Sequence, residues 1–152
     1  MKLAEGYEVE LGRLLPEVID LRAKILRPGL DRSTASFAGD EDPEAIHAIV
    51  RYRSRVIGVG SLVPEPYEHR PALRLRGMAV EDDFRGQGVG STVLEALLGF
   101  SQAPNSPGSG LVWCLARVRA RSLYERYGFV VDGDAFEIEP IGVHVRMLKV
   151  PR

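Results

Sequence analysis

Three glycines in five residues, at positions 86, 88 and 90, separate an expected strand from an expected helix. Glycine has no Cβ atom, so a ligand can approach the main chain closely there. The first turn of a helix also presents unpaired N–H groups and a partial positive charge. With Arg85 beside it, this turn predicts a binding site for a phosphate or a diphosphate.

Three kinds of ligand compete for such a turn. A P-loop needs a lysine before its serine or threonine, whereas Ser91 follows Gly90 directly, which disfavours nucleotide hydrolysis. A dinucleotide fingerprint beginning at Gly86 needs glycine at the position of Ser91 and an acid about 20 residues later. Residues 106–110 contain no acid, so a nucleotide-dependent oxidoreductase is disfavoured as well. The diphosphate of coenzyme A is the third ligand.

Strands and helices alternate along the rest of the chain. Strands are expected at 7–11, 46–52, 55–63, 73–80, 111–116, 129–138 and 142–150, and helices at 16–26, 88–100 and 118–127. This order predicts an α/β or α+β sandwich. The helix between strands 73–80 and 111–116 serves as a crossover, so these two strands should be parallel neighbours.

The strand at 73–80 carries an irregularity. Simple alternation places Leu73, Leu75, Gly77 and Ala79 on one face of the sheet. Glycine inside a strand, however, indicates a bulge or a close approach of another group to the backbone. We therefore expect Gly77 to mark such a point.

Bulk composition limits the class of protein. A length of 152 residues fits one domain, and a net charge of −1 gives no basic field that would attract nucleic acid. No run approaches the roughly 20 apolar residues that span a bilayer. The N-terminus lacks the apolar core of a signal peptide, so we expect a cytoplasmic protein without membrane contact.

The numbers of cysteine, histidine, arginine and lysine residues bear on whether the chain can hold a disulfide, a metal ion or a phosphate. One cysteine, Cys114, and three scattered histidines lack the spacing of a disulfide framework or a metal site. Arginine outnumbers lysine by 17 to 3, which suits phosphate recognition or simply reflects genome composition.

Two motifs, on either side of one strand, resemble those of the GNAT (Gcn5-related) N-acetyltransferase family. Arg85, Gly88 and Gly90 fill the family's Arg/Gln-x-x-Gly-x-Gly/Ala cofactor pattern. Residues 120–129 are similar to the family's A-x-x-x-Y-x-x-x-G-F segment, and the resemblance covers residues 73–131 best. Outside this region, the chain resembles the ElaA-type branch of the family at Asp40 with Asp42, at His47 and at the segment 142–144.

The resemblance implies a single domain over residues 1–152. Its mixed sheet would have six or seven strands, two splayed parallel central strands at 73–80 and 111–116, and helices on both faces. The protein would move an acetyl group from acetyl-CoA, without a metal, to a primary amine of a small molecule or peptide. The residues that the resemblance assigns to the cofactor are Met78, Ala79, Val80, Arg85, Gly86, Gln87, Gly88, Val89, Gly90, Ser91, Arg117 and Tyr124.

The resemblance also implies a mechanism of direct attack through a tetrahedral intermediate. The backbone N–H of Met78 would stabilise the oxyanion, and Tyr124 would protonate the leaving thiolate. Helical periodicity alone would instead make Tyr124 an ordinary core residue. His144, Glu137 or a chain of waters is the candidate general base. Many family members have, at the position of Arg117, an asparagine that contacts the pantetheine arm. The chain therefore departs from the family pattern at this contact.

Several alternatives stay open at this point. A non-catalytic module that binds or senses acyl-CoA would explain Arg117 and the lack of an evident base. The acidic segment 40–42 would attract a cationic amine such as a polyamine, an aminoglycoside or a peptide N-terminus, unless it is an ordinary solvated turn. Dimerisation is common in the family, so a homodimer is open as well.

Overall fold

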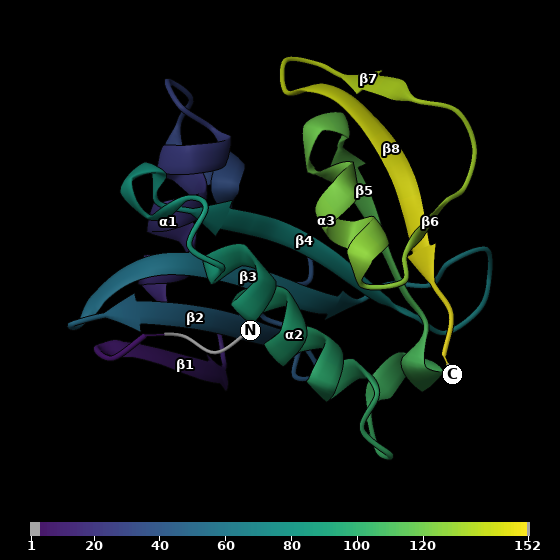
Figure 1. Cartoon of the computed structure of the whole chain (residues 1–152). Helices are drawn as coiled ribbons and strands as arrows, with labels where there is room; N and C mark the ends of the chain where they lie inside the picture. Colours follow the sequence, from purple (N-terminus) through teal and green to yellow (C-terminus); the bar gives the residue numbers. More distant parts are fainter. Residues whose placement is uncertain (1–3, 152) are drawn as a thin grey trace.

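Within residues 4–151, which the computed structural model describes, eight strands form one mixed sheet. The strand order is β1-β2-β3-β4-β5-β8-β6, with β7 paired to β8 (Figure 1). The strands are β1 (Tyr7–Gly12), β2 (Ile46–Tyr52), β3 (Arg55–Pro64), β4 (Leu73–Val80), β5 (Val112–Arg117), β6 (Val130–Val131), β7 (Phe136–Ile138) and β8 (Gly142–Lys149). The α-helices are α1 (Pro16–Leu26), α2 (Val89–Ser101) and α3 (Arg121–Arg126).

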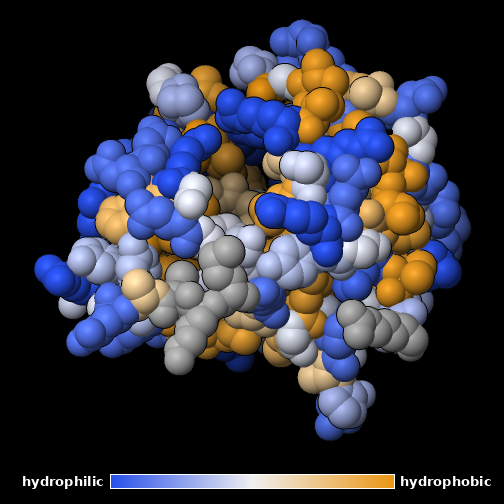
Figure 2. Space-filling model, viewed as in Figure 1, coloured by the Kyte–Doolittle hydropathy of each residue, from blue (hydrophilic) through white to orange (hydrophobic). Residues whose placement is uncertain are grey.

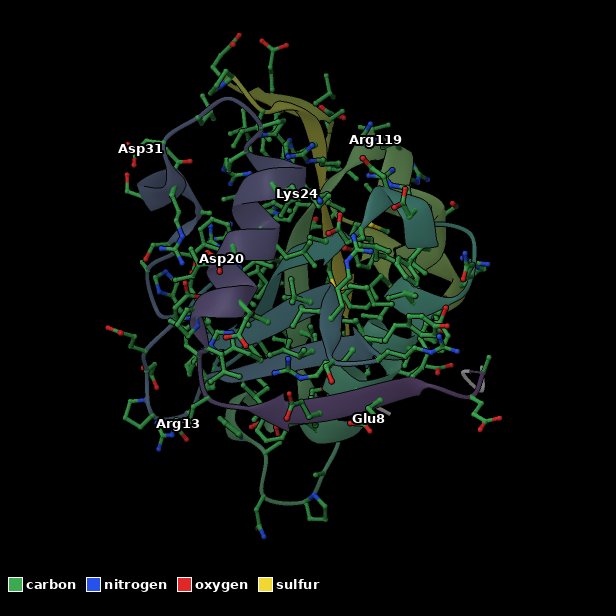
Figure 3. The ribbon with its side chains drawn as sticks, turned by 90° about the vertical axis from the view of Figure 1, so that its left-hand side faces the viewer. Glu8, Arg13, Asp20, Lys24, Asp31 and Arg119 are labelled. Carbon is green, nitrogen blue, oxygen red and sulfur yellow. The ribbon has the colours of Figure 1, made fainter. Side chains whose placement is uncertain are left out.

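Helices cover both faces of the sheet, as predicted. On one face, Val18 and Leu21 of α1 pack against Val59 of β3 and Ala79 of β4. On the other face, α2 and α3 share a larger core, and both lie in front of the sheet in Figure 1. Figure 3, turned by 90°, shows α1 with its labelled Asp20 and Lys24. The predicted fold class is therefore confirmed.

The first helix begins and ends where its sequence predicts. Pro16 occupies the first turn, Glu17 is the acid near the N-terminus and Lys24 is the cation near the C-terminus. Proline tolerates the first turn because its missing N–H would have no helical partner there, and the two charges oppose the helix dipole. Buried Val18 and Leu21 then fix which face of α1 contacts the sheet.

A bulge in β4 reverses its alternation. Opposite β3, Val59 faces Ala79 and Ser61 faces Arg76, so Gly77 and Met78 together oppose a single residue. Gly77 has a φ of 70°, a conformation that favours glycine. The predicted bulge is confirmed, but the predicted shared face is wrong beyond it. Leu73 and Leu75 belong to the core under α2, whereas Ala79 belongs to the core under α1.

The two central parallel strands separate along their length. β4 pairs with β5 over three residues, from Leu73 opposite Val112 to Leu75 opposite Cys114. Beyond this point no register joins the two strands within residues 4–151. The predicted splay is confirmed, and it leaves backbone groups of both strands beside a gap at the centre of the sheet.

Two predicted elements differ from the structure. The single strand expected at 129–138 is wrong, because Gly133, with a φ of 94°, breaks it into β6 and β7, which pair with different parts of β8. This break accounts for the eighth strand. The helix expected at 118–127 starts as a 3-10 turn over Val118–Ala120, where no side chain caps the helix, and becomes α-helical only in α3.

Candidate active site

A cleft of about 710 Å³ opens where β4 and β5 separate. It is lined by both strands, the turn before α2, the 3-10 turn and helix of α3, the end of α1 and part of β8. Figure 2, in the view of Figure 1, shows the surface hollowed between the region of α1 and that of α3, with strongly hydrophilic residues at the rim. All of the predicted cofactor-binding residues except Gln87 line this cleft.

The glycine turn has the backbone geometry that its sequence predicts. Gly86 and Gly88 have φ values of 76° and 82°, and Gly88 is the residue directly before α2. No side chain caps the helix, so its first N–H groups face the cleft end of the turn without a competing partner. Arg85 forms an ion pair with Asp82 at 3.0 Å, and both side chains are exposed. This turn can accept an anion.

Gln87, unlike its neighbours in the turn, does not line the cleft. The Tyr7 hydroxyl donates to Oε1 of Gln87 at 3.0 Å, and Nε2 of Gln87 donates to the carbonyl of Asp83 at 3.4 Å. Tyr7 also packs edge-on against Phe84, with ring centroids 6.3 Å apart. The Gln87 side chain therefore joins the turn to β1 and does not line the cleft.

Tyr124 is buried in the wall of the cleft. Its ring contacts Phe129, with centroids 5.6 Å apart, and no hydrogen bond engages its hydroxyl within the part of the chain that the structure describes. Burial raises the pKa of Tyr124 above its ordinary value, so the phenol stays protonated at neutral pH. Burial also raises the pKa of the nearby Cys114 thiol to about 12, which makes Cys114 a poor nucleophile.

His144 lies in the cleft wall opposite Arg117, its register partner on β5. Its Nδ1 lies 2.7 Å from the carbonyl oxygen of Gly142, which can only accept, so Nδ1 carries the proton. Burial lowers the pKa of His144, and the cations Arg117 and Arg27 lower it further. His144 is therefore neutral at pH 7, with Nε2 as a free basic nitrogen.

Glu137, the other predicted base, lies outside the cleft. It is exposed on β7 and pairs with Val143 on β8. The alternation of β8 gives the reason: His144 is buried on the side that faces the cleft, whereas its neighbour Val143 is exposed. Of the two predicted bases, His144 alone lines the cleft that Tyr124 and Met78 also line.

The cleft is strongly cationic, which the sequence analysis missed. Its lining contains Arg27, Arg74, Arg76, Arg85, Arg117, Arg119 and Arg126. No aspartate or glutamate among residues 4–151 lines it. The excess of arginine over lysine was the available signal, but these arginines come from distant parts of the chain, and only the fold brings them together.

Three of these arginines gather at the end of α1. Arg27 and Arg117 both donate to the carbonyl of Leu26, at 3.1 and 2.9 Å. The guanidinium carbons of Arg27 and Arg76 lie 5.3 and 4.1 Å from the ring centroid of Phe37. Burial, and to a lesser degree the neighbouring charge of Arg74, lowers the pKa of Arg76 to about 10.

The acidic segment 40–42 does not supply a counter-charge to the cleft. Asp40 is buried and pairs with Arg22, with a shortest distance of 2.7 Å. Asp42 accepts the backbone N–H of Glu44 in a surface turn. Neither carboxylate lines the cleft, so the expectation that this segment attracts a cationic amine has no support at this site.

Residues 4–151 contain neither a side-chain cluster arranged for a metal ion nor a membrane-spanning helix. No group of three or more histidine, cysteine, aspartate or glutamate side chains is arranged to bind a metal ion. No helix in this part of the chain is long and apolar enough to cross a membrane.

Splayed parallel strands beside an uncapped, glycine-rich helix N-terminus form a cleft that suits the diphosphate and the extended, amide-bearing arm of coenzyme A. Comparison with known proteins agrees. The family model "Acetyltransferase (GNAT) domain" matches residues 43–131. The N-acetyltransferase YitI of Bacillus subtilis is 30% identical over 139 residues, which cover 90% of this chain and 91% of YitI. The chain belongs to the GNAT acetyltransferase family, whose members use acetyl-CoA.

Solved structures share the fold at low sequence identity. Escherichia coli ElaA superposes with a TM-score of 0.75 at 13% identity, covering 95% of this chain and 99% of ElaA. An acyl-CoA N-acyltransferase from Pseudomonas aeruginosa gives a TM-score of 0.74 at 17% identity, with the same coverage. These likenesses show the fold, and the resemblance to the ElaA-type branch in particular stays a prediction.

Proposed function

We propose that this protein transfers the acetyl group of acetyl-CoA to a primary amine that also carries an anionic group. Residues 1–152 would act as one catalytic domain. The observation that carries the proposal is the charge of the cleft: seven arginines line it, and no acidic residue of the described chain does. A dianionic or carboxylate-bearing substrate would lower the free energy of this arrangement, whereas a polycation would raise it.

The turn between β4 and α2 fits the diphosphate of coenzyme A. The open first turn of α2, the positive φ values at Gly86 and Gly88, and Arg85 all favour a bound anion at this end of the cleft. Met78, Ala79 and Val80 line the adjoining part, where β4 has lost its partner β5 and its backbone groups can pair with the amides of a pantetheine arm.

When bound, acetyl-CoA supplies a thioester whose carbonyl carbon accepts the amine nitrogen. Nε2 of His144 would take the proton of the attacking amine. The backbone N–H of Met78, which follows the Gly77 bulge, would stabilise the charge on the carbonyl oxygen. Once the new C–N bond has formed, the C–S bond would break and the Tyr124 hydroxyl would donate its proton to the departing sulfur. The burial that raises the pKa of Tyr124 also raises the proton affinity of a thiolate beside it.

The amine substrate would be oriented from the α1 side of the cleft. Arg27 and Arg117 share the Leu26 carbonyl, and Arg76 has no acidic partner within residues 4–151. Arg74 and Arg85, by comparison, are already paired with Glu65 and Asp82. A carboxylate or phosphate on the substrate would therefore bind to the guanidinium groups of Arg27, Arg76 and Arg117, with charge-assisted hydrogen bonds.

Matched pairs of amines test this proposal. We would measure acetyl-CoA-dependent thiol release with phosphoethanolamine against ethanolamine, with glycine against glycinamide, and with spermidine. We expect each amine with an anionic group to exceed its partner without one by at least about tenfold in kcat/KM, equivalent to about 1.4 kcal/mol. Arg76→Met should remove this preference and leave the Kd for CoA within about twofold.

Other outcomes would count against the proposal in distinct ways. A preference for spermidine would overturn the anionic substrate while leaving the acetyltransferase reaction in place. Tight binding of acetyl-CoA without amine-dependent thiol release, across the panel, would favour the non-catalytic module that the sequence left open.

A further inference from the structure

A cluster of buried polar side chains lies beneath α1, and the proposed reaction does not use it. Arg22, Asp40, His47 and Ser61 are 0%, 4%, 1% and 0% exposed. They come from α1, the loop after it, β2 and β3, so the fold has brought four separate segments to one point. Removing charged groups from water is costly unless they are fully paired, so the pairing decides what this cluster can do.

In each hydrogen bond of the cluster, the chemistry of the two groups fixes which one donates and which one accepts. Nη1 and Nη2 of Arg22 donate to the two carboxylate oxygens of Asp40, at 2.7 and 2.8 Å. Nη2 of Arg22 also donates to Oγ of Ser61 at 2.9 Å. Because the Asp40 carbonyl can only accept, the proton of His47 lies on Nε2, 2.9 Å away, and Ser61 donates to Nδ1 of His47. Every member is thereby oriented by its neighbours.

The cluster supports the aromatic wall of the cleft. Oδ2 of Asp40 accepts the backbone N–H of Phe37 at 2.8 Å, and the Arg22 guanidinium carbon lies 4.3 Å from the centroid of the Phe37 ring. Arg76 and Arg27, at 4.1 and 5.3 Å from the same centroid, contact this ring within the cleft. Phe37 therefore connects the buried ion pair to two of the arginines that face the substrate.

Arg22 also contacts the bulge in β4. A Cβ atom at Gly77 would lie 2.6 Å from Nε of Arg22, which is too close for any side chain. This Nε is buried and has no hydrogen-bond partner in the described chain. The planar guanidinium therefore packs directly against the backbone that precedes Met78.

A buried ion pair is weak evidence for stability, because desolvation offsets most of its attraction. The contacts of this pair point to a different role. We propose that Arg22 and Asp40 are positioning residues for the amine site: they fix Phe37, and through it Arg27 and Arg76, in the arrangement that binds the anionic group. This inference rests on the proposed function.

Phosphate binding to the CoA-saturated protein tests the inference without a known amine. Saturation with CoA fills the diphosphate site, so calorimetric titration with inorganic phosphate reports the arginine cluster. The double variant R22M/D40L removes both charges together and leaves no unpaired buried ion. We expect it to weaken phosphate binding at least tenfold and to change the Kd for CoA less than twofold. Phe37→Leu, which leaves the ion pair intact, should weaken phosphate binding to a similar degree.

The exposed pair Arg32–Asp20, with a separation of 2.8 Å, provides the matched control. R32M/D20L should leave both affinities unchanged. Phosphate binding that Arg76→Met abolishes but that both R22M/D40L and Phe37→Leu retain would overturn the inference and leave the proposed function standing. If the wild-type protein shows no phosphate binding that depends on Arg76, the anionic amine site is wrong and the inference falls with it.

Discussion

Tyr124 and His144 reach the same cleft from α3 and β8, and their surroundings leave both neutral. Burial disfavours the charged form of each group, so it raises the pKa of the phenol and lowers that of the imidazole. A protonated phenol can give a proton, and a neutral imidazole with Nδ1 already engaged can take one at Nε2. The pair therefore has the two protonation states that acyl transfer to an amine requires.

Replacing Tyr124 by phenylalanine should lower kcat by about 10² or more, the scale of general acid catalysis. The ring contact with Phe129 would remain, so the Kd for acetyl-CoA should change little. Tyr127→Phe is the control on the same segment, because Tyr127 does not line the cleft and its hydroxyl donates to Oε1 of Glu95 at 2.9 Å. Near-normal turnover by Tyr124→Phe would exclude Tyr124 as the acid.

The pH dependence of kcat should report His144. Its pKa is lowered from the ordinary value of about 6.5, so the imidazole is neutral above that pH and becomes charged only as the pH falls below it. Activity that depends on His144 should therefore be complete above pH 6.5 and be lost on acidification. His144→Gln should lower kcat by about 10² and flatten this acidic limb. An unchanged limb in that variant would assign it to another group.

Some residues of the site could be predicted from the sequence, and others could not. The positions of Met78, Tyr124 and the glycine turn followed from local motifs, and the structure places them around one cleft. The choice between Glu137 and His144 depended on which residues of β7 and β8 face inward, which a broken strand conceals. The grouping of Arg27, Arg76 and Arg117 depended on three distant segments meeting, which no local pattern encodes.

Among the elements, the turn before α2 allows the most direct prediction, which concerns both stability and cofactor binding. Gly88→Ala should lower stability by about 1 to 2 kcal/mol, because alanine must adopt a φ of 82° there. It should also raise the KM for acetyl-CoA by about tenfold, since Gly88 lines the cleft at the proposed diphosphate site.

Gly99→Ala is the matched change within the same helix. Gly99 is exposed in α2, and a Cβ atom there would meet nothing within 4 Å. Alanine should therefore stabilise the protein by about 0.5 to 1 kcal/mol and leave KM unchanged. Thermal unfolding and steady-state kinetics on both variants check the pair. Equal effects of the two substitutions on KM would argue against a ligand at the turn.

Element boundaries were predictable where local chemistry determines them. Pro16 and Pro28 with Gly29 delimited α1, and Gly77 marked a bulge. The consequences of that bulge were not predictable by alternation, because one extra residue exchanges the two faces of β4. The break at Gly133 lies in the turn sequence Asp132-Gly133-Asp134, which was overlooked because apolar residues lie beyond it in both directions.

At the scale of the whole molecule, charge is unevenly distributed. The net charge is only −1, yet the cleft contains seven arginines and no acidic residue of the described chain. The compensating carboxylates lie elsewhere, as with exposed Glu8 on β1 and Asp31 after α1, both labelled in Figure 3. A net charge near zero therefore conceals a local concentration of cationic side chains in the cleft.

A crystal structure of the protein with bound CoA tests the central claim most directly. We expect the diphosphate oxygens to accept hydrogen bonds from backbone N–H groups between residues 86 and 91. The sulfur should lie between Met78 and Tyr124, in the gap that β4 and β5 leave open. CoA bound elsewhere, or a structure in which these two strands pair along their whole length, would contradict the account.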